Sequence, residues 1–169
     1  MAERRIYLVR HGAAEDMAES GRDFDRALTA AGVSRMEAVA RGLATLGVEP
    51  QCLLVSPLVR AQQTADCLVS ALTPARRETW EELACGVDPE SIVARLDTLS
   101  ADGDLMLVGH EPDMGELLSF FLTGRTDSFW TRFRKGAVAC LTAGVLPPMG
   151  RAQLEWFERA AVLARIGDS

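Results

Sequence analysis

The chain has 169 residues, of which 48% are hydrophobic and 25% charged, a composition typical of one globular domain rather than of a disordered chain. Its formal net charge is −6, which argues against nucleic acid as a partner, because nucleic-acid-binding surfaces must neutralise phosphates. An anionic substrate would therefore need a pocket that is positive locally.

The cysteines indicate a reducing compartment. They stand at positions 52, 67, 85 and 140, and no pair has the CxxC spacing of zinc or redox motifs. We expect Cys52 and Cys67 to be buried thiols, because both lie within apolar patterns. The apolar run after Arg4-Arg5 is too short for a signal peptide, and no run reaches transmembrane length. We therefore expect a cytoplasmic protein that does not bind membranes.

The first third of the chain predicts a strand, a loop, a helix and a second strand. Residues 5–9 are apolar or β-favouring and are bounded by Gly12, which is typical of a buried parallel strand. A polar loop from Gly12 to Arg26 is expected to lie over the end of that strand. Thr29 then caps a predicted helix of residues 30–46. The run Cys-Leu-Leu-Val at 52–55 predicts the second buried strand.

The middle of the chain continues this alternation. Ser56-Pro57 predicts the start of a helix, with the serine as cap and the proline at the first helical position. A short strand is expected at residues 76–80, followed by a helix that begins at Asp88-Pro89. Residues 105–108 predict another buried strand, and Glu111-Pro112 predicts the start of the helix after it.

The C-terminal part is expected to complete the sheet. Residues 137–142 predict a strand, and residues 151–157 predict an edge strand followed by a short tail. Alternating strands and helices indicate an α/β protein, which we expect to be a three-layer α/β/α domain with a mainly parallel central sheet over residues 1–169. Three aromatic side chains before the last strands are expected to be buried: Phe129, Trp130 and Phe133.

Two histidines are all that the chain contains, and each directly follows or closely follows a predicted strand: His11 and His110. Ligands of parallel sheets bind outside the carboxyl ends of the strands, so both side chains should reach one edge. Arg10 precedes the first histidine, and Arg60 lies in the next helix off its apolar face. Guanidinium groups match phosphate oxygens, and imidazole carries protons or phosphoryl groups near neutral pH. The four residues therefore predict a phosphate pocket.

These residues carry a resemblance to the histidine phosphatase superfamily, which includes the phosphoglycerate mutases. Leu-Val-Arg-His-Gly at 8–12 resembles the signature of that superfamily, and residues 28–32 resemble its next element. Residues 56–65 resemble its second strand-to-helix motif, and Val-Gly-His-Glu-Pro at 108–112 resembles its last. The segments occur in the family's order over most of the chain, so the resemblance implies the phosphoglycerate mutase-like fold.

Within the superfamily the chain is most similar to the SixA-type phosphohistidine phosphatases. Larger members carry inserts that roof the site, whereas the segment between Cys67 and Leu105 is short here. Residues 82–86 and 136–139 also resemble SixA segments. The resemblance implies a hydrolase for phosphohistidine on a protein, such as a phosphotransfer domain or carrier protein in signal transduction. It implies no cofactor and no metal.

The resemblance also implies a role for each site residue. His11 would be the nucleophile that becomes phosphorylated, and Arg10, Arg60 and His110 would bind the phosphoryl group. Glu82 is the positional match to the acidic proton donor of the phosphoester-cleaving members. SixA-type enzymes depend less on such an acid, so Glu82 enters as a candidate proton donor.

The expected mechanism is in-line attack by neutral His11 on phosphorus, followed by attack of water on the phosphohistidine. A backbone carbonyl of the turn at Gly12 should fix the tautomer of His11, and a protonated His110 should bind phosphoryl oxygens. An alkoxide leaving group needs a proton donor, whereas imidazole leaves from phosphorus more readily. A site without a well-placed acid would therefore favour P–N cleavage.

Other functions remain open at this point. The nearest is a small phosphomonoester phosphatase that acts on a metabolite phosphate, and a further one is a non-catalytic phosphate-binding regulator. A metal hydrolase is disfavoured because two histidines without an HExxH motif make a poor ligand set. A serine hydrolase is disfavoured because the chain has no GxSxG motif.

Overall fold

The computed structural model describes residues 3–100 and 102–169. Its strands are β1 (Arg4–Arg10), β2 (Cys52–Val55), β3 (Arg76–Thr79), β4 (Leu105–Gly109), β5 (Val138–Ala143) and β6 (Gln153–Glu158). Its helices are α1 (Ala30–Thr45), α2 (Val59–Val69), α3 (Pro89–Asp97), α4 (Asp113–Thr123) and α5 (Ala160–Gly167), with short 3-10 turns η1 (Asp23–Asp25) and η2 (Glu81–Leu83). None of these helices is long and apolar enough to cross a membrane.

The strands form one six-stranded sheet in the order β3-β2-β4-β1-β5-β6. The first four strands of this order are parallel, while β5 runs antiparallel to β1 and β6 antiparallel to β5. The connection from β5 to β6 is short, and a short connection can join only antiparallel neighbours. The predicted α/β class with a mainly parallel sheet is confirmed, and the two reversed strands make the sheet mixed.

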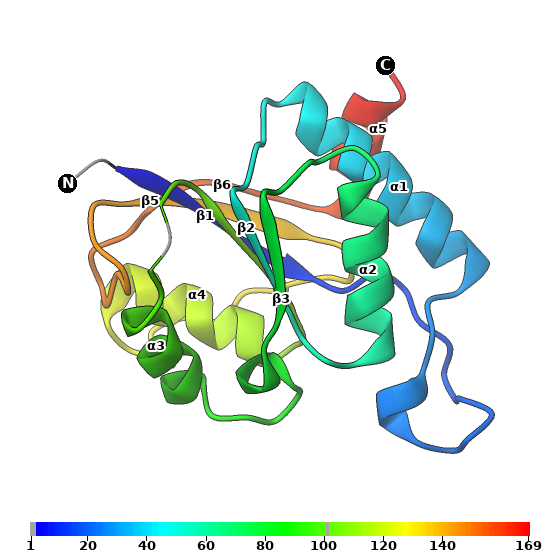
Figure 1. Cartoon of the computed structure of the whole chain (residues 1–169), viewed down its shortest axis with the longest axis horizontal. Helices are drawn as coiled ribbons and strands as arrows, with labels where there is room; N and C mark the ends of the chain where they lie inside the picture. The colour runs from blue at the N-terminus through cyan, green and yellow to red at the C-terminus, as the bar shows by residue number, and fades with distance from the viewer. Residues whose placement is uncertain (1–2, 101) are drawn as a thin grey trace.

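Helices cover both faces of the sheet (Figure 1). Successive side chains of a strand point to opposite faces. In β1, Tyr7 and Val9 pack with α1, α2 and α5, whereas Ile6 and Leu8 pack with α3 and α4. Both faces of the central strands are therefore buried, which explains why their sequences are continuously apolar instead of alternating.

Helix α1 forms as predicted, because the Thr29 hydroxyl accepts a hydrogen bond from the backbone N–H of Gly32 at 2.9 Å. The cap predicted at Ser56-Pro57 is wrong. Helix α2 begins at Val59, and Leu58 is its N-cap residue without a side-chain cap. The Ser56 hydroxyl lies instead 2.6 Å from a ring nitrogen of His110, so it belongs to the strand ends rather than to the helix.

The tail predicted after the last strand is wrong as well, since it forms helix α5. This helix packs closely on α1 because glycines stand at the contact: a Cβ added at Gly42 would lie 1.9 Å from the carbonyl oxygen of Leu163. The predicted burial of Trp130 is also wrong, because its side chain is 89% exposed, while Phe133 is buried. Cys52 and Cys67 are buried free thiols, as predicted.

Candidate active site

The ends of two neighbouring parallel strands bring the two histidines together. Arg10 ends β1 and His11 follows it, while His110 follows β4. The backbone N–H of His11 donates to the carbonyl oxygen of Gly109 at 3.0 Å, which fixes the two strand ends side by side. The imidazole ring centroids lie 5.1 Å apart with an angle of 51° between the planes.

The site leaves buried hydrogen-bond donors without partners. The residues His11, Arg60 and His110 are only 5%, 2% and 1% exposed. Among the described residues, four buried polar side-chain atoms lack a partner, and three of them belong to this site: Nε of Arg10, Nε of Arg60 and Nδ1 of His110. An unsatisfied buried donor costs about 1–3 kcal/mol. A bound anion would satisfy such donors, so the arrangement fits a group with several acceptor oxygens.

His11 is held in one tautomer by the turn that follows it. Its Nδ1 lies 2.7 Å from the carbonyl oxygen of Gly12. A carbonyl oxygen can only accept, so Nδ1 carries the hydrogen and Nε2 keeps its lone pair. Burial lowers the pKa of His11 to about 4, with a smaller lowering contribution from the charge of Arg60. The imidazole is therefore neutral and nucleophilic at neutral pH.

His110 is neutral too in the free protein, whereas the expectation of a protonated ring concerns the state with a bound phosphoryl group. Burial, with smaller contributions from His11 and Arg60, lowers its pKa to about 3. Its Nε2 lies 2.6 Å from the Ser56 hydroxyl oxygen, which also accepts from the backbone N–H of Leu58 at 3.3 Å. The hydroxyl hydrogen of Ser56 has a partner when it donates to Nε2, while the hydroxyl oxygen accepts from Leu58. The hydrogen of His110 then sits on Nδ1, as a neutral donor that faces no protein acceptor.

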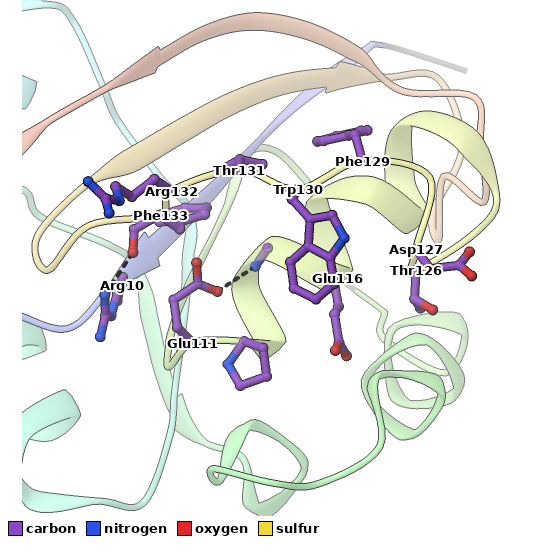
Figure 2. A pocket seen from close by; sticks show the side chains of 12 residues that line it. Arg10, Glu111, Glu116, Thr126, Asp127, Phe129, Trp130, Thr131, Arg132 and Phe133 are labelled. Atoms are coloured by element: carbon purple, nitrogen blue, oxygen red, sulfur yellow. Dashed lines mark hydrogen bonds between the residues drawn. The ribbon is translucent and has the colours of Figure 1, made fainter.

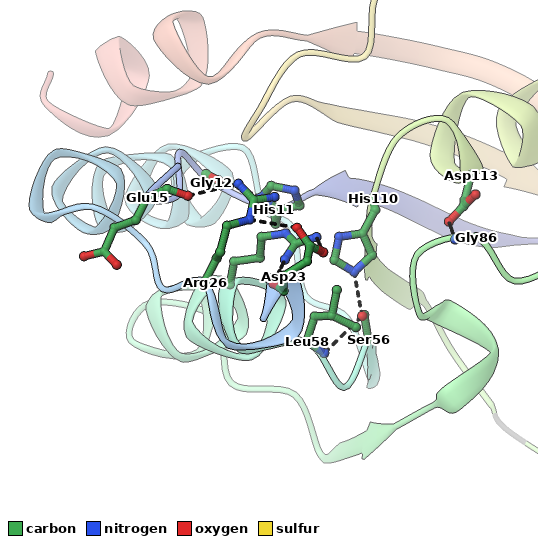
Figure 3. A network of polar contacts seen from close by, with 11 residues as sticks. His11, Gly12, Glu15, Asp23, Arg26, Ser56, Leu58, Gly86, His110 and Asp113 are labelled. Carbon is green, nitrogen blue, oxygen red and sulfur yellow. Dashed lines mark hydrogen bonds and ion pairs between the residues drawn. The ribbon is translucent and has the colours of Figure 1, made fainter. Parts of the chain in front are cut away.

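The polar loop after β1 closes over Arg60. Nη1 of Arg60 donates to the carbonyl oxygen of Asp23 at 2.8 Å, and Nη2 of Arg60 lies 3.0 Å from the Asp23 carboxylate. Arg26 binds the other oxygen of that carboxylate at 2.8 Å. Figure 3 shows Asp23 and Arg26 beside His11 and His110. Sequence reasoning missed Asp23, and its only signal was an acidic residue in the loop expected over the strand end.

Thr64 joins the first turn of the site to α2. Its hydroxyl accepts from the backbone N–H of Gly12 at 3.0 Å and donates to the carbonyl oxygen of Arg60 at 2.7 Å. One buried hydroxyl therefore fixes both the turn that orients His11 and the start of the helix that carries Arg60. Thr64 lies in the motif that resembles the family, but sequence reasoning gave it no role.

Arg10 forms the outer side of the site. Its Nη1 donates to the carbonyl oxygen of Phe133 at 2.9 Å, as the dashed line in Figure 2 shows. Burial lowers its pKa, while the neighbouring Glu111 acts in the opposite direction. Arg10 and Glu111 line a cavity of about 480 Å³, whose wall includes the exposed Trp130.

Two carboxyl groups lie in segments that resemble the family, Glu82 and Glu111, and Glu111 lines the cavity beside Arg10. Glu82 lies in η2, and within the described residues no hydrogen bond or ion pair joins it to Arg10, Arg60 or either histidine. Glu111 accepts from the backbone N–H of Gly115 at 3.0 Å, and burial raises its pKa. Glu111 is therefore a second candidate acid beside Glu82.

Comparison with known proteins points to one family. The profile of the histidine phosphatase superfamily (branch 1) matches residues 6–91. The chain is 31% identical to the phosphohistidine phosphatase SixA of Escherichia coli K12 over 156 residues, which cover 90% of this chain and 91% of that one. It is 38% identical to an uncharacterised protein of Picosynechococcus over 123 residues, covering 72% and 74%. Among solved structures, that of the protein histidine phosphatase SixA complexed with tungstate is 27% identical, with a TM-score of 0.79 and coverage of 94% and 99%.

Proposed function

The chain belongs to the histidine phosphatase superfamily and is a phosphatase, and from this premise we propose that it hydrolyses phosphohistidine on a protein through a covalent intermediate on His11. One observation carries the proposal: three buried N–H donors without partners belong to side chains that neighbour a neutral imidazole, and the Nε2 of that imidazole makes no hydrogen bond within the described residues. We also propose that residues 1–169 form a single domain of this type.

In the proposed reaction, Nε2 of His11 attacks phosphorus and the P–N bond to the substrate's imidazole breaks. Three equatorial oxygens accept hydrogen bonds from Arg10, from Nε of Arg60 and from Nδ1 of His110. The substrate's ring leaves as neutral imidazole because its other nitrogen already carries a proton, and the electron pair of the broken P–N bond stays on the nitrogen that releases phosphorus. Water then attacks the phosphohistidine at position 11, which releases inorganic phosphate and restores the neutral ring.

The low pKa of His110 bears on how charge builds up in this site. A neutral donor on Nδ1 can bind a phosphoryl oxygen without adding a third positive charge beside Arg10 and Arg60. The approach of a phosphoryl dianion would itself raise the pKa of His110, because an opposite charge nearby favours the cation. His110 can thus become protonated with substrate, after being neutral without it.

A phosphomonoester phosphatase is the second candidate, and Glu111 is the observation that favours it. Alkoxide departure needs a proton, and general acids typically contribute 10²–10⁴-fold. A carboxyl with a raised pKa beside Arg10 could supply that proton. The two candidates therefore differ in whether an acid is needed, and Glu111 with Glu82 are the residues to vary.

The test uses the purified chain without added metal. We expect it to hydrolyse a phosphohistidine protein faster than every member of a panel of sugar and nucleotide phosphates. His11→Ala should abolish turnover and the acid-labile phosphoenzyme that brief reaction with labelled substrate otherwise traps. Normal turnover by His11→Ala would overturn the proposed nucleophile, and preference for a phosphoester would favour the second candidate.

A matched pair of variants addresses the acid. We expect Glu82→Gln and Glu111→Gln to keep phosphohistidine hydrolysis within about threefold, because an imidazole leaving group needs no carboxylic acid. Residual phosphoester hydrolysis should fall in Glu111→Gln and stay unchanged in Glu82→Gln. A large loss of phosphohistidine hydrolysis in either variant would refute the mechanism without an acid.

A further inference from the structure

A second cavity, of about 550 Å³, opens beside the site and is lined almost entirely by cations. Its lining holds Arg10 at the inner end and five further basic side chains: Arg35, Arg132, Arg134, Lys135 and Arg159. We call these five residues and the space between them the basic cleft. The two other lining residues are alanines at the start of α5, so the lining within the described residues contains no acidic side chain.

The basic cleft is exceptional in a chain of net charge −6. All five side chains are exposed, and none takes part in an ion pair within residues 3–100 and 102–169. By contrast, seven arginines elsewhere in the described residues form an ion pair with a carboxylate, such as Arg77 with Asp66 at 2.7 Å. Five like charges that share one opening without counter-charges produce a concentrated positive potential at the rim of the site.

The fold gathers this charge from three separate parts of the chain. Arg35 comes from α1, the run Arg132–Lys135 comes from the segment before β5, and Arg159 is the N-cap residue of α5. Arg10 and Arg132 also line the cavity next to Glu111, and Figure 2 shows both side chains. The basic cleft is thus continuous with the phosphoryl-binding residues rather than a separate patch.

We propose that the basic cleft docks an acidic surface of the substrate protein, namely the carboxylates that flank its phosphohistidine. This inference rests on the proposed function. The cations spread outward from Arg10 across an open cleft larger than a phosphoryl group needs, and all five outer ones are exposed. Such an arrangement suits several carboxylates on a protein surface, whereas a single small anion would be held by buried donors like those of Arg60.

The first experiment compares three phosphohistidine substrates on the unaltered protein: the free amino acid, a peptide with glutamates on both sides, and the same peptide with lysines. Electrostatic attraction changes association by 10–10³-fold, so we expect kcat/KM for the acidic peptide to exceed that for the basic one at least about tenfold in low salt. The ratio should approach one at about 0.5 M NaCl, where exposed charges are screened. Turnover of free phosphohistidine should be insensitive to salt by comparison.

A pair of double variants assigns the preference to the basic cleft. Arg35→Glu with Arg134→Glu reverses two of its charges, and Arg151→Glu with Arg165→Glu makes the same charge change at exposed positions outside it. We expect the first pair to abolish or invert the peptide preference and the second pair to keep it. Free phosphohistidine reports that each variant folds and turns over.

The outcomes separate this proposal from the proposed function. Equal kcat/KM for the two peptides in low salt, or equal preference in both double variants, would overturn the docking proposal while leaving the phosphohistidine phosphatase intact. Failure of the unaltered protein to hydrolyse any phosphohistidine substrate would instead overturn the proposed function. The peptide comparison needs no variant, so a double variant that fails to fold leaves the proposal testable.

Discussion

The protonation of His11 and His110 offers the sharpest test of the site, because the chain has no other histidine to obscure the signals. We expect His11 to titrate at about 4 and His110 at about 3, against an ordinary value of 6.5. Water stabilises the imidazolium ion, and both rings are almost fully removed from water. The experiment lowers the pH from 8 to 3 on the unaltered protein and follows the protonation of both rings.

The size of the effect follows from the pKa. At pH 5, about 90% of an imidazole with a pKa of about 4 is neutral, against about 3% at the ordinary 6.5. If His11 attacks as the neutral ring, the kcat/KM at pH 5 should be about 30-fold higher than an ordinary histidine would allow, after correction for the substrate's ionisation. Activity should thus hold to about pH 5 and then fall tenfold per pH unit below 4.

The same lowering links pH to stability. Below pH 6.5, His11 becomes protonated in the unfolded chain but stays neutral in the folded protein. The contribution of His11 to the free energy of unfolding is therefore complete above pH 6.5 and is lost as the pH falls towards 4. The gap between 6.5 and about 4 corresponds to about 3 kcal/mol of unfolding free energy. Acid should therefore weaken the fold before it titrates the folded site.

Long-range ¹H–¹⁵N NMR spectra measure both the titration and the tautomer. We expect the hydrogen on Nδ1 in both rings, since Gly12 accepts from His11 and Ser56 donates to His110. Arg10→Gln is the informative variant, because loss of one nearby cation should raise the pKa of His11. A midpoint near 6.5 for His11, or a hydrogen on its Nε2, would refute the reasoning.

Three further predictions concern residues that support the site. Ser56→Ala removes the partner of Nε2 of His110, so kcat for phosphohistidine should fall about tenfold and NMR should show a second tautomer of that ring. Ser56→Thr keeps a hydroxyl, so it should restore kcat and the single tautomer. Thr64→Val keeps the shape but strands the backbone N–H of Gly12, so urea unfolding should show a loss of about 1–3 kcal/mol. Burial raises the pKa of Asp113 to about 6 from 3.8, so its ionisation costs about 3 kcal/mol as the pH rises from 4 to 7; Asp113→Asn should lose that decline relative to the unaltered protein, and equal pH dependence of the two urea midpoints would contradict it.

The sequence predicts the position of this site better than its chemistry. The central strands are continuous apolar runs, and the rule that ligands bind at the carboxyl ends of parallel strands needs only their order. The sequence alone therefore assigns Arg10, His11 and His110 to one edge of the sheet. The tautomer of His11 followed too, because the carbonyl that fixes it belongs to the next residue, Gly12.

Features that depend on burial or on distant segments could not be predicted. The charge of His110 depends on how completely three elements exclude water from it, which no local pattern records. Asp23 reaches Arg60 across 37 residues of sequence, through a loop whose path is set by tertiary contacts. Helix α5 was missed because the weak alternation of residues 151–157 favoured a strand followed by a tail, although residues 152–166 could also be helical. The packing of Ala160–Gly167 on α1 is what makes that part a helix.

The unpartnered donors of the site destabilise the fold, and further hydrogen bonds hold their side chains in place. Three buried donors without partners, at about 1–3 kcal/mol each, weaken a fold whose total stability is of order 5–15 kcal/mol. Each donor is nevertheless held by a second contact on the same side chain: Arg10 by Phe133, Arg60 by Asp23 and His110 by Ser56. These contacts prevent the side chains from turning away to satisfy their free N–H groups. The donors are thus oriented before the substrate arrives, and a bound phosphoryl group supplies the hydrogen-bond acceptors that they lack in the free protein.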